Sequence, residues 1–197
     1  MDDGATPMYL AAGNGHIEVV RLLIEAGADT NKATDFGATP LFAAACGGHI
    51  EVARFLVEVG ADIDKATEDV GATPLFVAAQ NGHIEVAQFL VKNGADTNKA
   101  TDHGETPLHT AAGGGHIQVI RFLTEAGIDI SKTTDYGATP LLAAACWCHI
   151  EAVRFLIEIR ADTNKATDDG TTPLLQAAQC GHLEVIRILV EVGADTN

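Results

Sequence analysis

Histidine and cysteine are the side chains of this sequence best suited to bind a metal ion, and the histidines are regularly spaced. Six of the eight histidines recur at nearly constant intervals, at His16, His49, His83, His116, His149 and His182. The ligands of one ion must converge within a few ångströms in a tetrahedral or octahedral shell. Residues that recur once per structural repeat lie in separate layers instead. The periodic histidines are therefore predicted to hydrogen-bond to the backbone near the start of a helix rather than to bind metal.

A denser group of possible metal ligands is Cys146-Trp147-Cys148-His149. Cys-x-Cys is a poor chelating spacing, and no second Cys/His pair completes a set of four ligands. Cys180 follows one interval later and could approach this group, which keeps a metal site as the weaker alternative. We expect buried or half-buried free thiols, with no metal and no cofactor.

The catalytic motifs that can be recognised by spacing are missing from the sequence. It contains no Gly-x-Ser-x-Gly, no phosphate-binding loop and no His-Glu-x-x-His. Gly113-Gly114-Gly115 lacks the Lys and Ser/Thr of a phosphate loop. The acidic residues recur with the histidines, so each has a structural explanation first. The sequence thus predicts no enzyme activity and no catalytic residues.

The charge of the chain limits its possible partners. The formal net charge is −15 and hydrophobic residues make up 47%. Such acidity argues against binding to nucleic acid or to an anionic membrane. It favours a partner of basic character, or it merely keeps the protein from self-associating. Four cysteines, no secretory signal and no apolar run near the ~18 residues of a spanning helix predict a reduced, cytoplasmic protein.

An internal repeat positions all of these residues. The six prolines all stand in Thr-Pro pairs, spaced 33 residues apart and once 34, at 6–7, 39–40, 73–74, 106–107, 139–140 and 172–173. A period of this length indicates a repeat architecture whose units must stack to bury their apolar faces.

One repeat shows how the chain is expected to fold. Residues 35–38 predict a tight turn, after which Thr39 caps a first helix and Pro40 occupies its first position. Gly48 ends that helix, because glycine accepts positive φ at low cost. Residues 49–58 predict a second helix that ends at Gly60, and residues 61–67 form a polar arm.

The pattern resembles the ankyrin repeat family. The matching segments are Gly37-Ala38-Thr39-Pro40-Leu41, Ala44-Ala45, Gly48-His49-Ile50-Glu51-Val52, Phe55-Leu56 and Gly60-Ala61-Asp62. The resemblance covers the whole chain as one domain, residues 1–197, in six repeats: 2–34, 35–67, 68–101, 102–134, 135–167 and 168–197. It implies an all-α solenoid of stacked helix-turn-helix units with hairpin arms. It also implies a concave protein-binding face lined by the hairpin tips and the first helices.

Several positions depart from the family pattern. Thr-Pro-Leu-His is complete only in the fourth repeat, where it ends in His109. The third repeat has one extra tip residue within 68–71. Cys148 and Arg160 replace glycines at which positive φ is expected, so the fifth repeat should be the least stable layer.

The outer repeats do not carry obviously polar outer faces, as capping repeats should. Ile186, Leu189 and Val190 are expected to be exposed on the last repeat. The chain is expected to be a segment of a longer array or a designed, consensus-like repeat protein. We expect a monomer with some tendency to stack end to end.

Positions that differ between repeats are the candidates for partner contact. They are the tip position, which Asp3 occupies in the first repeat, and the pair that follows each double alanine. In the fourth repeat they also include Glu105, which follows the tip glycine. The predicted partner-binding residues are Phe36, Val70, Gln80, Asn81, His103, Glu105, Tyr136, Trp147 and Asp169. Exposed aromatic residues often anchor interfaces.

Two functions fit the sequence. The first is a non-catalytic scaffold that binds another protein on the concave face. The alternative is a structural spacer within a long array, or a designed scaffold without a natural partner, which the uniformity of the repeats favours.

Overall fold

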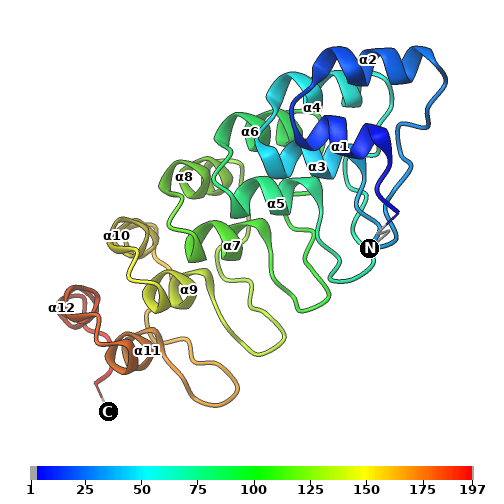
Figure 1. The fold of residues 1–197 in the computed structure, drawn as a ribbon. Helices are drawn as coiled ribbons and strands as arrows, with labels where there is room; N and C mark the ends of the chain where they lie inside the picture. The colour runs from blue at the N-terminus through cyan, green and yellow to red at the C-terminus, as the bar shows by residue number, and fades with distance from the viewer. Residues whose placement is uncertain (1–3, 197) are drawn as a thin grey trace. The chain divides into compact units, whose positions relative to one another are not determined.

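The protein folds into pairs of short helices, one pair for each predicted repeat (Figure 1). The structure is a computed structural model and describes residues 4–196. The first helices are α1 (Pro7–Gly13), α3 (Pro40–Gly47), α5 (Pro74–Gln80), α7 (Pro107–Gly113), α9 (Pro140–Cys146) and α11 (Pro173–Cys180). The second helices are α2 (Ile17–Glu25), α4 (Ile50–Glu58), α6 (Ile84–Lys92), α8 (Ile117–Glu125), α10 (Ile150–Glu158) and α12 (Leu183–Glu191). The predicted all-α class is confirmed, and residues 4–196 contain no strand. Asp3, the first of the predicted tip positions, lies outside the described residues.

The backbone contacts divide the chain into two compact units, Met1–Asp102 and His103–Asn197. The first unit holds the helix pairs from α1 to α6, and the second holds those from α7 to α12. In each unit the first helices pack in sequence order, α1 on α3 and α3 on α5, then α7 on α9 and α9 on α11. Each unit is thus a stack of three repeats, which is the predicted solenoid arrangement.

The Thr-Pro pairs start the first helices as predicted. Thr39 Oγ1 accepts a hydrogen bond from the Phe42 amide at 3.2 Å, and Thr139 Oγ1 accepts one from the Leu142 amide at 3.1 Å. The following proline lies where no amide proton is needed. The cap therefore fixes where each first helix begins.

Residues in the left-handed region join the two helices of a repeat and end the second helix. Gly48 has φ 71° and Gly60 has φ 95°. Cys148 and Arg160 keep the same conformation with φ 61° and 70°, and they are the non-glycine residues with positive φ in the described chain. The expectation that both positions require positive φ is confirmed.

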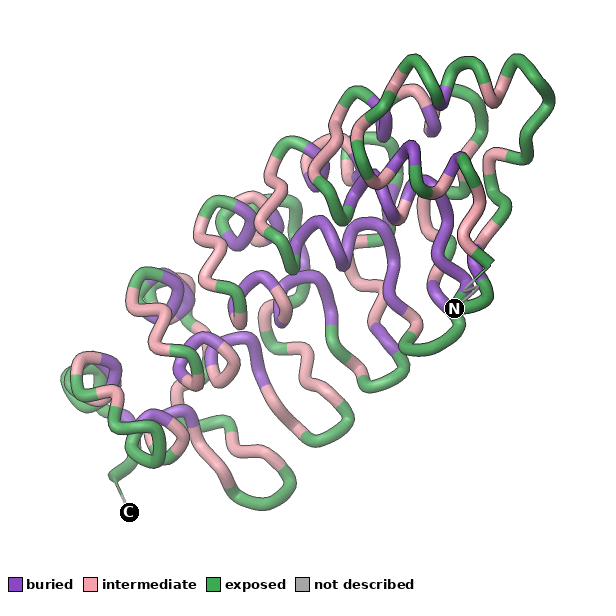
Figure 2. The backbone as a smooth tube through the Cα atoms, viewed as in Figure 1, coloured by how far each residue is buried: buried purple, intermediate pink, exposed green. Residues whose placement is uncertain are grey.

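Small residues let the first helices approach closely. Ala44, Ala45, Ala144 and Ala145 are completely buried, together with one leucine near the start of the helix, such as Leu41 or Leu141. In Figure 2 the buried segments follow the first helices, and the tips of the arms are exposed. Between repeats, arginines of second helices stack on the next phenylalanine, Arg21 on Phe55 and Arg121 on Phe155, with 4.3 and 4.2 Å to the ring centres.

Helix α12 corrects one expectation about the last repeat. Leu189 is fully buried and Ile186 is half-buried, while Val190 is exposed. Leu189 is buried because α12 packs against both α11 and α10, so its apolar side faces into the second unit. Arg154 of α10 also forms an ion pair of 3.0 Å with Glu184 of α12.

Candidate functional site

Four of the hairpin tips are held by their backbones, which leaves their side chains outside. The Phe36 and Val70 carbonyls accept hydrogen bonds from the Glu68 and Asp102 amides at 2.8 and 3.0 Å. In the second unit, the His103 and Tyr136 carbonyls accept from the Asp135 and Asp168 amides, both at 3.0 Å. These four tips are thereby fixed by the following repeat without using their side chains.

The structure places all nine predicted contact residues at the surface. Tyr136 and Trp147 are each 68% exposed, Phe36 is 56% exposed and Val70 is 39% exposed. The first unit carries Phe36, Val70, Gln80 and Asn81, and the second unit carries His103, Glu105, Tyr136, Trp147 and Asp169. Only the second unit thus presents two strongly exposed aromatic residues, and both belong to the fifth repeat.

Asn81 has a structural role besides its exposure. Its Nδ2 donates to the Cys46 carbonyl at 3.1 Å, at the end of the preceding first helix. His83 Nε2 donates to the same oxygen at 2.9 Å. These bonds satisfy a carbonyl at a helix end that would otherwise lack a partner, so Asn81 helps to hold two repeats together.

The periodic histidines form a ladder of backbone hydrogen bonds, as predicted. His49 Nε2 donates to the Gly13 carbonyl at 3.0 Å, and His149 Nε2 donates to the Gly113 carbonyl at 2.8 Å. The acceptor lies in the preceding repeat, which the sequence did not reveal. Within residues 4–196, no cluster of three or more His, Cys, Asp or Glu residues could hold a metal ion.

A groove lies between the fifth and sixth repeats in the second unit. It has a volume of about 310 Å³ and is lined by Tyr136, Leu142, Thr167, Asp168, Asp169, Thr171 and Gln176. The Thr167 hydroxyl donates to the Asp169 carboxylate, and the Thr171 amide donates to it at 3.2 Å. The hydrogen bond from Thr167, and then those from Thr171, lower the pKa of Asp169. The groove therefore combines an exposed aromatic ring with a firmly ionised carboxylate.

The sequence pattern predicted Tyr136 and Asp169 of this groove but not Leu142 and Gln176. A signal was present, because the position of Gln176 varies from repeat to repeat: Leu10, Ala43, Val77, Thr110, Ala143 and Gln176. Variation in the first helix therefore also marks a residue that lines this groove.

Comparison with known proteins agrees with this architecture. A model of ankyrin repeats matches three times, over residues 1–67, 64–134 and 127–197. The chain belongs to the ankyrin repeat family. The crystal structure of the human ASB11 ankyrin repeat domain is similar, with 30% sequence identity and a TM-score of 0.89 over 97% of this chain and 85% of that one. Ankyrin repeats are in general modules of protein–protein interaction, and the fold is known as a non-enzymatic scaffold.

The fourth repeat carries a buried histidine, His109, at the last position of the ankyrin Thr-Pro-Leu-His motif. His109 is 4% exposed, accepts from the Thr106 amide at 3.2 Å and donates through Nε2 to the Ala138 carbonyl at 3.1 Å. Burial lowers the pKa of His109, outweighing the opposite effect of its backbone hydrogen bonds. The imidazole is thus a neutral connection between the fourth and fifth ankyrin repeats.

No helix among residues 4–196 has the length and apolar character that crossing a lipid bilayer would require.

Proposed function

We propose that this chain is a non-catalytic scaffold that binds another protein through its hairpin tips and first helices, the face expected to be concave. The observation that supports this proposal is the surface of the fifth repeat. Tyr136 stands exposed beside an acidic groove, and Trp147 stands equally exposed at the end of the first helix of that repeat. Exposed aromatic residues are common anchors of protein interfaces. Binding is accordingly centred on the fourth and fifth repeats and the adjoining groove.

The partner segment has basic character and carries an apolar side chain. Asp168 and Asp169 line the groove together with Tyr136 and Leu142, and the chain has a net charge of −15. Complementary charge steers such a segment to the groove, while the apolar lining favours a buried side chain. We place this interaction in the cytoplasm, because four cysteines are too few for a disulfide framework.

A displayed library of random peptides, selected on the immobilised full chain, tests the proposal. Selected peptides should be enriched in Lys or Arg next to an apolar residue. Tyr136→Ala and Trp147→Ala should each weaken binding of a selected peptide by about 2 kcal/mol. Asp168→Asn combined with Asp169→Asn should weaken it and reduce its dependence on salt.

Phe36→Ala is the matched control, because Phe36 occupies the same tip position in the first unit. It should leave the affinity unchanged. If Phe36→Ala weakens binding as much as Tyr136→Ala, the centre of binding lies elsewhere. If no peptide is selected above background, the spacer function becomes the better account.

A further inference from the structure

Two cysteines lie side by side across the boundary between the fifth and sixth repeats. Cys146 ends α9 and Cys180 ends α11, and these helices pack together. Gln176 Nε2 donates to Cys146 Sγ at 3.5 Å and to Cys180 Sγ at 3.4 Å. The two sulfur atoms are therefore no farther apart than the sum of these distances. The backbones are also tied together, because His182 Nε2 donates to the Cys146 carbonyl at 2.9 Å.

The two thiols differ in accessibility. Cys180 is exposed and Cys146 is half-buried. Burial raises the pKa of the Cys146 thiol, and the neighbouring Cys180 thiol raises it further. A soluble reagent therefore reaches Cys180 first, and Cys146 is placed to react second.

Cys148 is a less suitable partner for Cys146, although it is closer in sequence. Cys148 occupies the left-handed position at which Gly15 and Gly48 lie in other repeats. A Cβ added to either glycine would lie 2.5 Å from the histidine ring of the next repeat. The side chain at this position is therefore directed at the next histidine.

We propose that Cys146 and Cys180 form a reversible oxidation site that reacts with low-molecular-weight disulfides such as oxidised glutathione and closes to a cystine joining the fifth and sixth repeats. The Cys180 thiolate attacks one sulfur of the glutathione disulfide, forms a mixed disulfide and releases one glutathione thiolate. The Cys146 thiolate then attacks the Cys180 sulfur, forms the cystine and releases the second glutathione thiolate. The two thiol protons of the protein pass through solvent to the two released thiolates. The protein loses two electrons, which reduce the glutathione disulfide.

The cystine has a consequence for the groove, and this consequence rests on the proposed binding function. Gln176 lines the groove, and its Nε2 donates to both thiols. When the sulfur atoms bond directly, both hydrogen-bond acceptors of the Gln176 amide move, so this side chain must change its position in the groove lining. Oxidation should therefore weaken peptide binding.

The test incubates the full chain with oxidised glutathione and maps its peptides under non-reducing conditions. We expect a Cys146–Cys180 cross-link that reduced glutathione reverses. Cys180→Ser and Cys146→Ser should abolish it, whereas the control variants Cys46→Ser and Cys148→Ser should retain it. A glutathione adduct that persists on Cys180, a Cys146–Cys148 cross-link, or a cross-link between two chains would overturn the proposal.

The binding of a selected peptide is then measured on the oxidised and reduced chain. We expect oxidation to weaken binding about tenfold in the unsubstituted chain and to leave Cys180→Ser unaffected. A cystine that forms without changing the affinity would overturn the coupling to the groove. A cystine in a chain that binds no peptide in either state would refute the proposed function and leave the oxidation site intact.

Discussion

His182 reaches from the sixth repeat back to the fifth, where its Nε2 lies 2.9 Å from the carbonyl oxygen of Cys146. His49 has the same relation to Gly13 in the first unit, at 3.0 Å. In the first unit the left-handed residue below the ring is Gly15, and an added Cβ there would lie 2.5 Å from His49 Nδ1. The fifth repeat carries Cys148 at this position, so we expect its Cβ to crowd the His182 ring.

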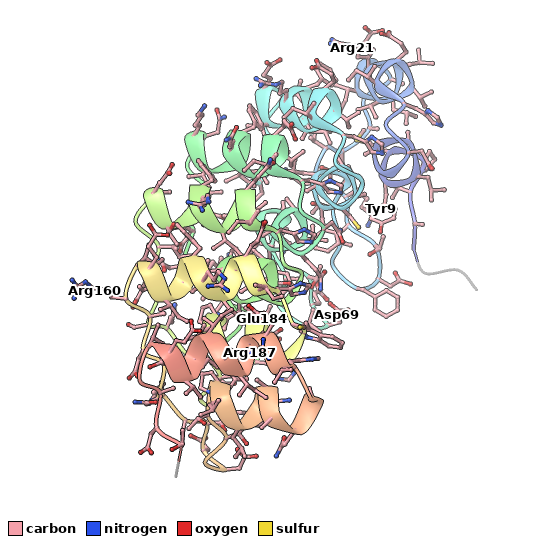
Figure 3. The ribbon with its side chains drawn as sticks, turned by 90° about the vertical axis from the view of Figure 1, so that its left-hand side faces the viewer. Tyr9, Arg21, Asp69, Arg160, Glu184 and Arg187 are labelled. Atoms are coloured by element: carbon pink, nitrogen blue, oxygen red, sulfur yellow. The ribbon has the colours of Figure 1, made fainter. Side chains whose placement is uncertain are left out.

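Cys148→Gly should stabilise the protein more than Arg160→Gly. Both substitutions remove the Cβ of a residue in the left-handed region, which should raise the free energy of unfolding by about 1 kcal/mol. Cys148→Gly also removes the crowding against His182. Arg160 has no such neighbour, because a Cβ at the equivalent Gly27, Gly60 or Gly127 would meet nothing within 4 Å. Figure 3 shows the Arg160 side chain extending away from the ribbon.

Urea unfolding of both single variants and of the double variant gives the free energies of unfolding. The cost should remain local, since solenoid stability is roughly a sum over repeats and their interfaces. Hydrogen exchange should therefore slow mainly within residues 135–167 in the double variant. An unchanged unfolding free energy, or faster interior exchange in a repeat other than the fifth, would contradict the expectation of a weak fifth repeat.

Acid should destabilise the fourth repeat through His109. Burial lowers the pKa of His109 in the folded state, whereas an unfolded chain has a histidine pKa near ~6.5. Between these two values the unfolded chain binds more protons, so stability falls as pH falls below about 6.5 and levels off below the folded pKa. Protonation would also turn Nδ1 into a donor facing the Thr106 amide, which now donates to it.

His109→Leu is the matched variant, because the fifth and sixth repeats carry Leu142 and Leu175 at this position. Unfolding free energies measured at about pH 7.5 and about pH 5 should differ less in the variant than in the unsubstituted chain. Equal pH dependence in both proteins would show that His109 does not contribute.

Chelators should leave the thermal unfolding midpoint unchanged. His149 uses Nε2 to donate to the Gly113 carbonyl at 2.8 Å, so this nitrogen carries a proton and does not serve as a metal ligand. Thermal unfolding with and without a chelator tests the prediction. A large fall in the midpoint would restore the Cys146–His149 segment as a metal site.

The protein should be monomeric, with weak self-association at high concentration. Leu183 and Val190 on the last helix are 59% and 47% exposed, and exposed apolar surface promotes such contacts. Light scattering over a concentration series measures the average mass. A dimer that persists on dilution would be inconsistent with this expectation.

The fold could be predicted in detail because its determinants are local. Thr39-Pro40 and Gly48 specify where a helix begins and ends through capping and left-handed φ, and both act within a few residues. The pairing of Gln176 with Cys146 and Cys180 could not be predicted, because it depends on how adjacent first helices meet. The acceptor of His49 was missed for the same reason, since Gly13 lies in the preceding repeat.

The extra residue in the third repeat shows how freely the tips can change. Thr67 still pairs with Ala72, its amide donating to that carbonyl at 2.9 Å, and Val70 still accepts from the Asp102 amide. The extra residue thus lies in exposed backbone and leaves both of these hydrogen bonds in place. A lineage of such chains can lengthen or rewrite a tip in a single mutational step, so new recognition can evolve at the tips while the packed layers keep their inherited sequence.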